Sequence, residues 1–251
     1  MVFLSKSSLS CFLQCPQKYK LLYVDNLQDV IPRSPQAQRG LNVHEFCFQS
    51  YDHLKIVSGS LVYDVDWVDE KLSLANGEES HFLRNFLQME EERWEICKEM
   101  APKNPEEYFI PFMREKRLEN KGLEIVGIVD RVDKKFNGNF CVVDIKTEKP
   151  DYRPWRLTEL RREMAFYKIL VECSGELPEG KCVEDFAIYY PHDNSVLYEK
   201  FSTLTLTALR KNMGYMRGAI GRKDFPCRVT IYCRYCECVN LGCPMTFEGK
   251  L

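Results

Sequence analysis

The chain has 251 residues, of which 45% are hydrophobic and 12% aromatic, enough apolar surface to bury the core of a large domain. Charged residues make up 29% and nearly cancel to a net charge of -2, which excludes nucleic-acid binding through an overall basic field. No apolar run reaches the roughly 18 residues that span a bilayer, and the first residues lack the apolar stretch of a signal peptide. We therefore expect a soluble, cytoplasmic protein that does not contact membranes.

Alternating helical and strand patterns predict one mixed α/β domain over residues 1–251. Apolar residues at helical spacing predict helices near 6–22, 36–55, 80–100, 155–173 and 203–218, with an interruption of the first helix at Pro16. Strand-like runs lie near 108–119, 123–136 and 139–149, and a further pair lies within 183–201. The sequence FNGN predicts a hairpin between the second and third runs. Residues 56–78 predict no element.

Two acidic residues and a lysine lie on the predicted hairpin. Asp130 is near the end of one strand, and Asp144 and Lys146 in VVDIKTEKP share one face of the next. Carboxylates from adjacent strands can bind one Mg²⁺ ion, and a neighbouring lysine can orient a water molecule or stabilise a phosphate. The simpler alternative is a surface salt bridge between Asp144 and Lys146.

Twelve cysteines are many for a protein that is expected in the cytoplasm, where disulfides are rare. Five of them crowd into the C-terminal stretch CRVTIYCRYCECVNLGC, which indicates a metal or redox role. Scattered cysteines with apolar neighbours are expected to be small buried side chains: Cys47, Cys97, Cys141, Cys173 and Cys182.

Three of the C-terminal cysteines have the spacing C-x2-C-x6-C, namely Cys233, Cys236 and Cys243. Three thiolates leave a tetrahedral metal or an iron–sulfur cluster one ligand short. The candidates for the fourth ligand are Cys227 and Cys238 in the same stretch and Cys11 and Cys15 near the start of the chain.

Several short motifs, in order along the chain, resemble the RecB-like branch of the PD-(D/E)XK nuclease superfamily. The G-x-x-D and D-x-K-T motifs of that branch are matched by Gly127, Asp130, Asp144, Lys146 and Thr147. An upstream G-x-x-x-H motif is matched by Gly40 and His44, and the N-terminal motif S-x-S-x-L-x-x-F-x-x-C-P is matched around Cys15 and Pro16. The downstream Q-x-x-x-Y motif is matched only in part, by Glu163 and Tyr167, and the glutamate would repel a phosphate that a glutamine could bind.

The resemblance implies a restriction-endonuclease-like core, a central mixed β-sheet flanked by helices, with the N- and C-terminal segments joined by a metal cluster. The catalytic core would span about 105–175 and the cluster segments about 5–20 and 225–245. Mg²⁺ or Mn²⁺ would be held by His44, Asp130, Asp144 and the carbonyl oxygen of Ile145. Lys146 would position the attacking water, and Tyr167, with Arg161 and Arg162, would contact the substrate strand.

The resemblance also implies a four-iron four-sulfur cluster, as in AddB-type helicase-nucleases and CRISPR-associated RecB-like exonucleases. Its ligands would be Cys15, Cys233, Cys236 and Cys243. Zinc on the same ligands is the alternative occupant, and Cys238, Cys227 or Cys11 could replace a proposed ligand.

The expected function is a metal-dependent DNA nuclease, an exonuclease on single-stranded ends, with a helicase or CRISPR adaptation proteins as possible partners. DNA repair and CRISPR spacer acquisition are the implied pathways. The alternatives are a catalytically idle DNA-end-binding subunit of a larger complex and a zinc-stapled nuclease that acts on RNA. The sequence leaves two alternatives for each of two residues. His44 is a metal ligand or a core histidine, and Glu115 holds a second metal or pairs with Arg131.

Overall fold

The computed structural model of the protein describes residues 2–243, apart from the side chains of residues 231, 232 and 240. A central five-stranded sheet has the order β3-β4-β5-β6-β7. Its strands are β3 (Met113–Asn120), β4 (Ile125–Lys134), β5 (Phe140–Ile145), β6 (Val183–Tyr190) and β7 (Ser195–Lys200). All neighbours pair antiparallel except β5 and β6, which are parallel. A parallel pair requires a crossover connection, and α7 (Pro154–Cys173) provides it.

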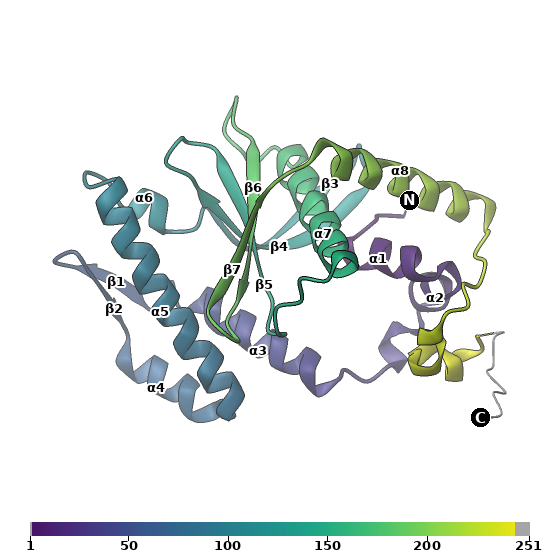
Figure 1. Cartoon of the computed structure of the whole chain (residues 1–251), viewed down its shortest axis with the longest axis horizontal. Coiled ribbons are helices and arrows are strands. Elements are labelled where there is room, and N and C mark those ends of the chain that lie inside the picture. Colours follow the sequence, from purple (N-terminus) through teal and green to yellow (C-terminus); the bar gives the residue numbers. More distant parts are fainter. Residues whose placement is uncertain (1, 244–251) are drawn as a thin grey trace.

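Helices cover both faces of this mixed sheet (Figure 1). On one face, α7, α8 (Thr203–Arg222) and α1 (Lys6–Gln14) enclose the larger hydrophobic core. On the other face, α3 (Pro35–Gln49) and α5 (Gly77–Met100) form a second core against Ile145 and Tyr189. The fold is therefore the α/β arrangement expected from the sequence.

The N-terminal helix is interrupted near Pro16, as its sequence predicts. Ser5 caps α1 through its side chain, which accepts a hydrogen bond from the Ser8 amide. Cys15 is extended, and Pro16 starts the short helix α2 (Pro16–Tyr19), which continues as a π-helical turn (Lys20–Val24) and, further on, a 3₁₀ turn (Leu27–Val30). The segment lies beside two C-terminal 3₁₀ turns, Ile231–Tyr235 and Glu237–Leu241 (Figure 1).

The predicted helix over 36–55 is too long at its C-terminal end, and residues 56–78 are structured. A hairpin of β1 (Leu54–Val57) and β2 (Ser60–Tyr63) follows α3. Its two-residue loop has positive φ at both Ser58 (50°) and Gly59 (78°), a geometry that matches the twist of the flanking strands. Two further helices, α4 (Val65–Leu74) and α6 (Glu106–Phe109), were not predicted.

A buried charge network ties α5 to β4. Arg131 donates to Glu90 at 2.7 Å, to Asp133 at 2.6 Å and to the Tyr51 hydroxyl at 2.9 Å. Arg93 adds a second cation 2.6 Å from Glu90. Glu90 and Arg131 are 0% and 3% exposed, so each charge depends on its partners rather than on water.

The prediction for the scattered cysteines is correct for three and wrong for two. Cys47, Cys97 and Cys141 are buried, whereas Cys173 and Cys182 are exposed. Cys173 is the last residue of α7 and Cys182 comes just before β6, and at such element ends an apolar neighbour in the sequence does not guarantee burial.

Candidate active site

Two aspartates and a lysine meet where the end of β5 lies beside the middle of β4; Asp130 is thus within its strand and not near the strand's end. Asp144 is 1% exposed in the central strand β5 and lies 2.8 Å from Lys146, measured from Oδ2 to Nζ. Asp130 on β4 accepts a hydrogen bond from the amide of Ile145 at 3.2 Å, which fixes its carboxylate beside β5. The salt bridge between Asp144 and Lys146 is thus present, but it is buried in a carboxylate cluster rather than exposed on the surface.

The pKa values of the two neighbouring carboxylates are shifted in opposite directions. Burial and the negative charge of Asp144 raise the pKa of Asp130 to about 6. Burial acts to raise the pKa of Asp144 as well, but Lys146 and Lys6 outweigh it and hold that pKa well below its usual range. The same ion pair holds the pKa of Lys146 above its ordinary value against the effect of burial.

His44 on α3 joins this cluster rather than the hydrophobic core. Its Nε2 donates to the carbonyl oxygen of Ile145 at 2.8 Å, and its Nδ1 lies 3.6 Å from Asp130. Four of the predicted site groups, the side chains of His44, Asp130 and Asp144 and the carbonyl of Ile145, are therefore in one place.

Tyr167 and Glu163 approach the same cluster from α7. Glu163 lies 3.3 Å from Lys146 and 3.6 Å from Lys6, so its charge is offset by two lysines. Tyr167 is buried, which raises the pKa of its hydroxyl to about 12. Its ring faces Lys6, with the ammonium 4.8 Å from the ring centroid.

Lys6 is a member of this cluster that the sequence did not indicate. Lys6 lies on α1, far from the other site residues in the sequence. Its ammonium is 3.5 Å from Asp144 Oδ1. The motif around Cys15 predicts the helix that carries Lys6, but it does not predict that the Lys6 side chain points toward Asp144.

Of the two motif glycines, Gly127 is a place of close approach, whereas Gly40 has room for a side-chain carbon at ordinary contact distance. An added Cβ at Gly127 would lie 3.0 Å from Leu170 of α7, and one at Gly40 would lie 3.6 Å from the Thr147 hydroxyl. Gly127 thus allows α7 to pack closely on β4, which brings Tyr167 toward Asp130.

The donor set suits a hard divalent cation, although no group of three or more His, Cys, Asp or Glu side chains within residues 2–243 is already arranged as a metal site. Asp144 Oδ2 is buried and accepts no hydrogen bond of good geometry from the described residues. Asp130 and Asp144 also repel each other, and a cation between them would relieve that repulsion. His44, Asp130, Asp144 and the Ile145 carbonyl are the groups that would hold it.

Several predicted partners lie elsewhere. Arg161 donates to Glu199 at 2.7 Å, and Arg162 lines a shallow cavity between α7 and α8. Of the two roles considered for Glu115, the ion pair with Arg131 is not formed, because Arg131 pairs with Asp133 and Glu90; the second metal stays a prediction. Glu115 lies instead at an irregularity of β3, with a positive φ of 39°.

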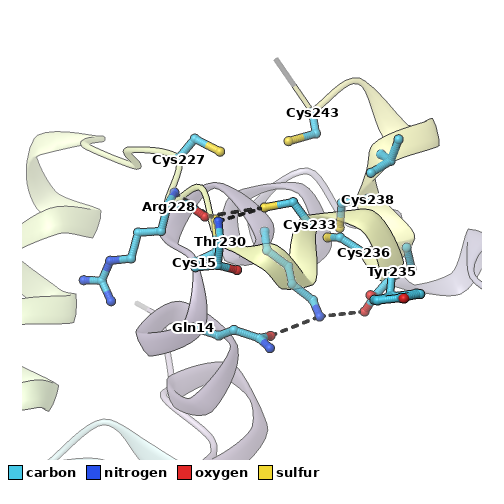
Figure 2. Close-up of a pocket in the computed structure, with 13 residues that line it drawn as sticks. Gln14, Cys15, Cys227, Arg228, Thr230, Cys233, Tyr235, Cys236, Cys238 and Cys243 are labelled. Atoms are coloured by element: carbon cyan, nitrogen blue, oxygen red, sulfur yellow. Dashed lines mark hydrogen bonds and ion pairs between the residues drawn. The ribbon is translucent and has the colours of Figure 1, made fainter. Parts of the chain in front are cut away.

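Cysteines from both ends of the chain line one cavity of about 240 Å³. The cavity is lined by Cys15, Cys227, Cys233, Cys236, Cys238 and Cys243. Figure 2 shows the sulfur atoms of Cys227 and Cys243 turned toward each other, and Cys15 accepts a hydrogen bond from the Arg228 amide at 3.4 Å. Cys11, on α1 one turn before Cys15, has a pKa raised to about 12 by burial. The predicted meeting of the two ends is present, whereas the described sulfurs do not form a metal-binding group.

Comparisons with known proteins agree with this architecture. The sequence profile of the PD-(D/E)XK nuclease superfamily matches residues 4–242. The fold resembles the crystal structure of a protein from Eubacterium rectale named "Putative exonuclease", with a TM-score of 0.53 and 11% sequence identity over 96% of this chain and 88% of the other. No curated protein sequence matches the chain, and no helix within residues 2–243 is long and apolar enough to cross a membrane. The profile match over nearly the whole length shows that the chain belongs to the PD-(D/E)XK nuclease superfamily.

Proposed function

We propose that this protein is a metal-dependent DNA nuclease, and that it acts as an exonuclease on single-stranded ends. The observation that carries the proposal is the pair of buried carboxylates, Asp130 and Asp144, held against each other beside Lys146. An idle site has no need to maintain this repulsion, whereas a nuclease uses it to bind a divalent cation. The preference for single-stranded ends, and a helicase or CRISPR adaptation partner, rest on the resemblance of the motifs alone.

The residues of the site have complementary roles in this proposal. Bound Mg²⁺ or Mn²⁺ would supply Lewis-acid stabilisation of the phosphate and lower the pKa of a water molecule. Lys146, held by Asp144, donates hydrogen bonds to the attacking water or to a phosphate oxygen. His44 holds the Ile145 carbonyl in place through its Nε2 hydrogen bond.

Lys146→Ala is expected to lower cleavage of end-labelled single-stranded DNA by about a hundredfold or more, because charged groups at a reacting phosphate contribute several kcal/mol. The measurement is the release of labelled product in Mn²⁺, with duplex DNA and RNA of the same sequence in parallel. The control is Lys211→Ala, which removes an exposed lysine of α8. Equal cleavage by the native protein and Lys146→Ala would contradict the proposed site, and preferential cleavage of RNA would favour the alternative substrate.

We further propose that the cysteine-lined cavity holds a four-iron four-sulfur cluster on Cys15, Cys233, Cys236 and Cys243. The convergence of thiols from both ends of the chain supports this, as do the amide hydrogen bonds to sulfur from Arg228 to Cys15 and from Thr230 to Cys233. Cys227 and Cys238 line the same cavity and are the candidates for replacing a ligand. The cluster would clip α1 to the C-terminal segment and thereby stabilise the fold.

Anaerobically purified protein is expected to contain iron and acid-labile sulfide and to absorb visible light. Cys236→Ala is expected to lose both the metal and the absorbance, whereas Cys173→Ala, which removes an exposed thiol outside the cavity, is expected to keep them. Zinc without sulfide in the native protein would identify the alternative occupant. Full metal content in Cys236→Ala would show that another cysteine is the ligand.

A further inference from the structure

Lys6 occupies a fixed position at the candidate active site. It is the first residue of α1, and the helix start is locked by reciprocal hydrogen bonds between Ser5 and Ser8. Leu4, two residues before Lys6, is anchored at the start of β4 through backbone hydrogen bonds with Glu124 and Val126 at 2.8 and 2.9 Å. The backbone is thus held by hydrogen bonds on both sides of Lys6, which fixes the position of its Cα atom relative to the site.

The ammonium of Lys6 is surrounded by anions but is not saturated by them. Its distances to Asp144 Oδ1 and Glu163 Oε2 are 3.5 and 3.6 Å, beyond the usual length of a hydrogen bond. The side chain is 24% exposed, so a ligand can reach it. Lys146, by comparison, is 2.8 Å from Asp144. Lys6 therefore makes no short ion pair with these two carboxylates and keeps N–H donors for a ligand.

The charges around Lys6 show what kind of ligand it suits. Asp130, Asp144 and Glu163 contribute three carboxylates to the cluster, and Lys6 and Lys146 contribute two ammonium groups. With a divalent cation on the aspartates, two lysines leave an excess of positive charge, whereas Lys146 alone would only balance the carboxylates. A phosphodiester is an anion that fits such an excess next to a metal.

We propose that Lys6 is a second cationic catalytic residue, which donates a hydrogen bond to a non-bridging oxygen of the substrate phosphate opposite Lys146. The proposal rests on the nuclease function proposed above and assigns the substrate contact of one residue. It also explains how the site accepts Glu163 where a glutamine is expected: the glutamate orients the two lysines rather than touching the phosphate.

The test measures binding rather than cleavage, in full-length protein with both aspartates intact and with Ca²⁺ in place of Mg²⁺, because Ca²⁺ also takes carboxylate oxygen ligands but polarises a bound water less. The dissociation constant of a fluorescent single-stranded oligonucleotide is followed by anisotropy over a series of salt concentrations, and a gel checks that the oligonucleotide stays intact. Lys6→Met is expected to weaken binding by about tenfold or more, the effect of one charged hydrogen bond. It is also expected to lower the slope of log affinity against log salt by about 0.7, the contribution of one phosphate contact on a single strand.

Two further variants separate a phosphate contact from a structural role. Lys6→Arg is expected to keep the salt slope, because the charge remains. Lys6→Met combined with Glu163→Gln is expected to stay weak with the lower slope. Restoration of slope and affinity by Glu163→Gln would overturn the proposal, because Lys6 would then act only by neutralising Glu163. An unchanged slope in Lys6→Met would overturn it as well, provided thermal unfolding shows that the variant is folded.

Failure of the nuclease function gives a different pattern. Binding in Ca²⁺ without any cleavage in Mg²⁺ or Mn²⁺ would refute the nuclease proposal, and the salt slopes would still decide the role of Lys6. Absence of all oligonucleotide binding would overturn the Lys6 contact, because no phosphate would then be held.

Discussion

Replacing Asp130 with asparagine is expected to abolish cleavage and, in the metal-free protein, to raise the stability above about pH 6. Burial and the charge of Asp144 raise the pKa of Asp130 from its usual 3.8 to about 6. The folded state therefore holds a proton on Asp130 that the unfolded state has already lost, and stability falls as the pH rises through this window. Asparagine removes that cost, which is on the order of 2–3 kcal/mol.

The loss of activity has a separate cause. Asp130 is one of the groups that would hold the divalent cation, and Lewis-acid stabilisation is worth several kcal/mol, which corresponds to a decrease of about a hundredfold or more in the rate. In chelator, urea unfolding at pH 8 is expected to show a more stable variant. In Mg²⁺ the native protein is expected to gain stability by binding, and Asp130→Asn is not. A variant that is less stable than the native protein in chelator would contradict this account.

Asp144→Asn is the matched comparison, because it also removes one carboxylate oxygen charge from the site. Burial works against the charged form of Asp144, but Lys146 and Lys6 overcome it and depress its pKa. The stability that Asp144 contributes is therefore present above the usual pKa of an aspartate and is lost in the variant, at about 3 kcal/mol for a broken buried ion pair. Both variants are expected to be inactive, with opposite changes in stability.

Arg131→Met is expected to destabilise the fold by about 3–5 kcal/mol, because it leaves Glu90 and Asp133 with fewer partners in a buried site. Burial acts to raise the pKa of Glu90, but Arg131 and Arg93 hold it near about 2. Urea denaturation at pH 7 measures the loss. Arg117→Met, on the exposed side of β3, is the control and is expected to change stability by no more than about 0.5 kcal/mol.

The same network gives a pH dependence with a defined sign. Because the pKa of Glu90 is lowered in the folded state, its contribution is complete above the ordinary glutamate value of 4.5 and is lost as the pH falls toward about 2. The Arg131→Met protein is expected to show a weaker dependence over this window. An identical acid-unfolding profile for the two proteins would show that the network does not set the stability.

The hairpin that carries Asp130 and Asp144 could be predicted because its signals are local. Asp144 and Lys146 alternate along one strand, and Asp130 lies on the strand that the FNGN turn brings beside it. The helix carrying Glu163 and Tyr167 follows the strand directly, and Pro154 marks its first turn. These residues are close together in the chain, so the order of the motifs and the turn between the strands were enough to predict that they meet.

Other parts depend on packing between distant segments. Nothing in the sequence near Lys6 states that α1 docks against α7, and the pairing of Arg131 with Glu90 joins two elements that are far apart in the chain. Residues 56–78 form short elements whose apolar runs are too brief to distinguish a strand from a helix. Arg161 was assigned to the substrate because it is basic, but a nearby glutamate on β7 already binds it.

The docking of Leu4 and Lys6 against β4 and β5 has a consequence for the order of folding. Leu4 and Lys6 precede β4, β5 and α7 in the chain, so they cannot find their partners until those elements have formed. Until then the chain exposes an amphipathic helix without a surface to cover it, and the carboxylate cluster lacks one of its two lysines. The cluster is thus completed only by a contact between segments that are more than a hundred residues apart.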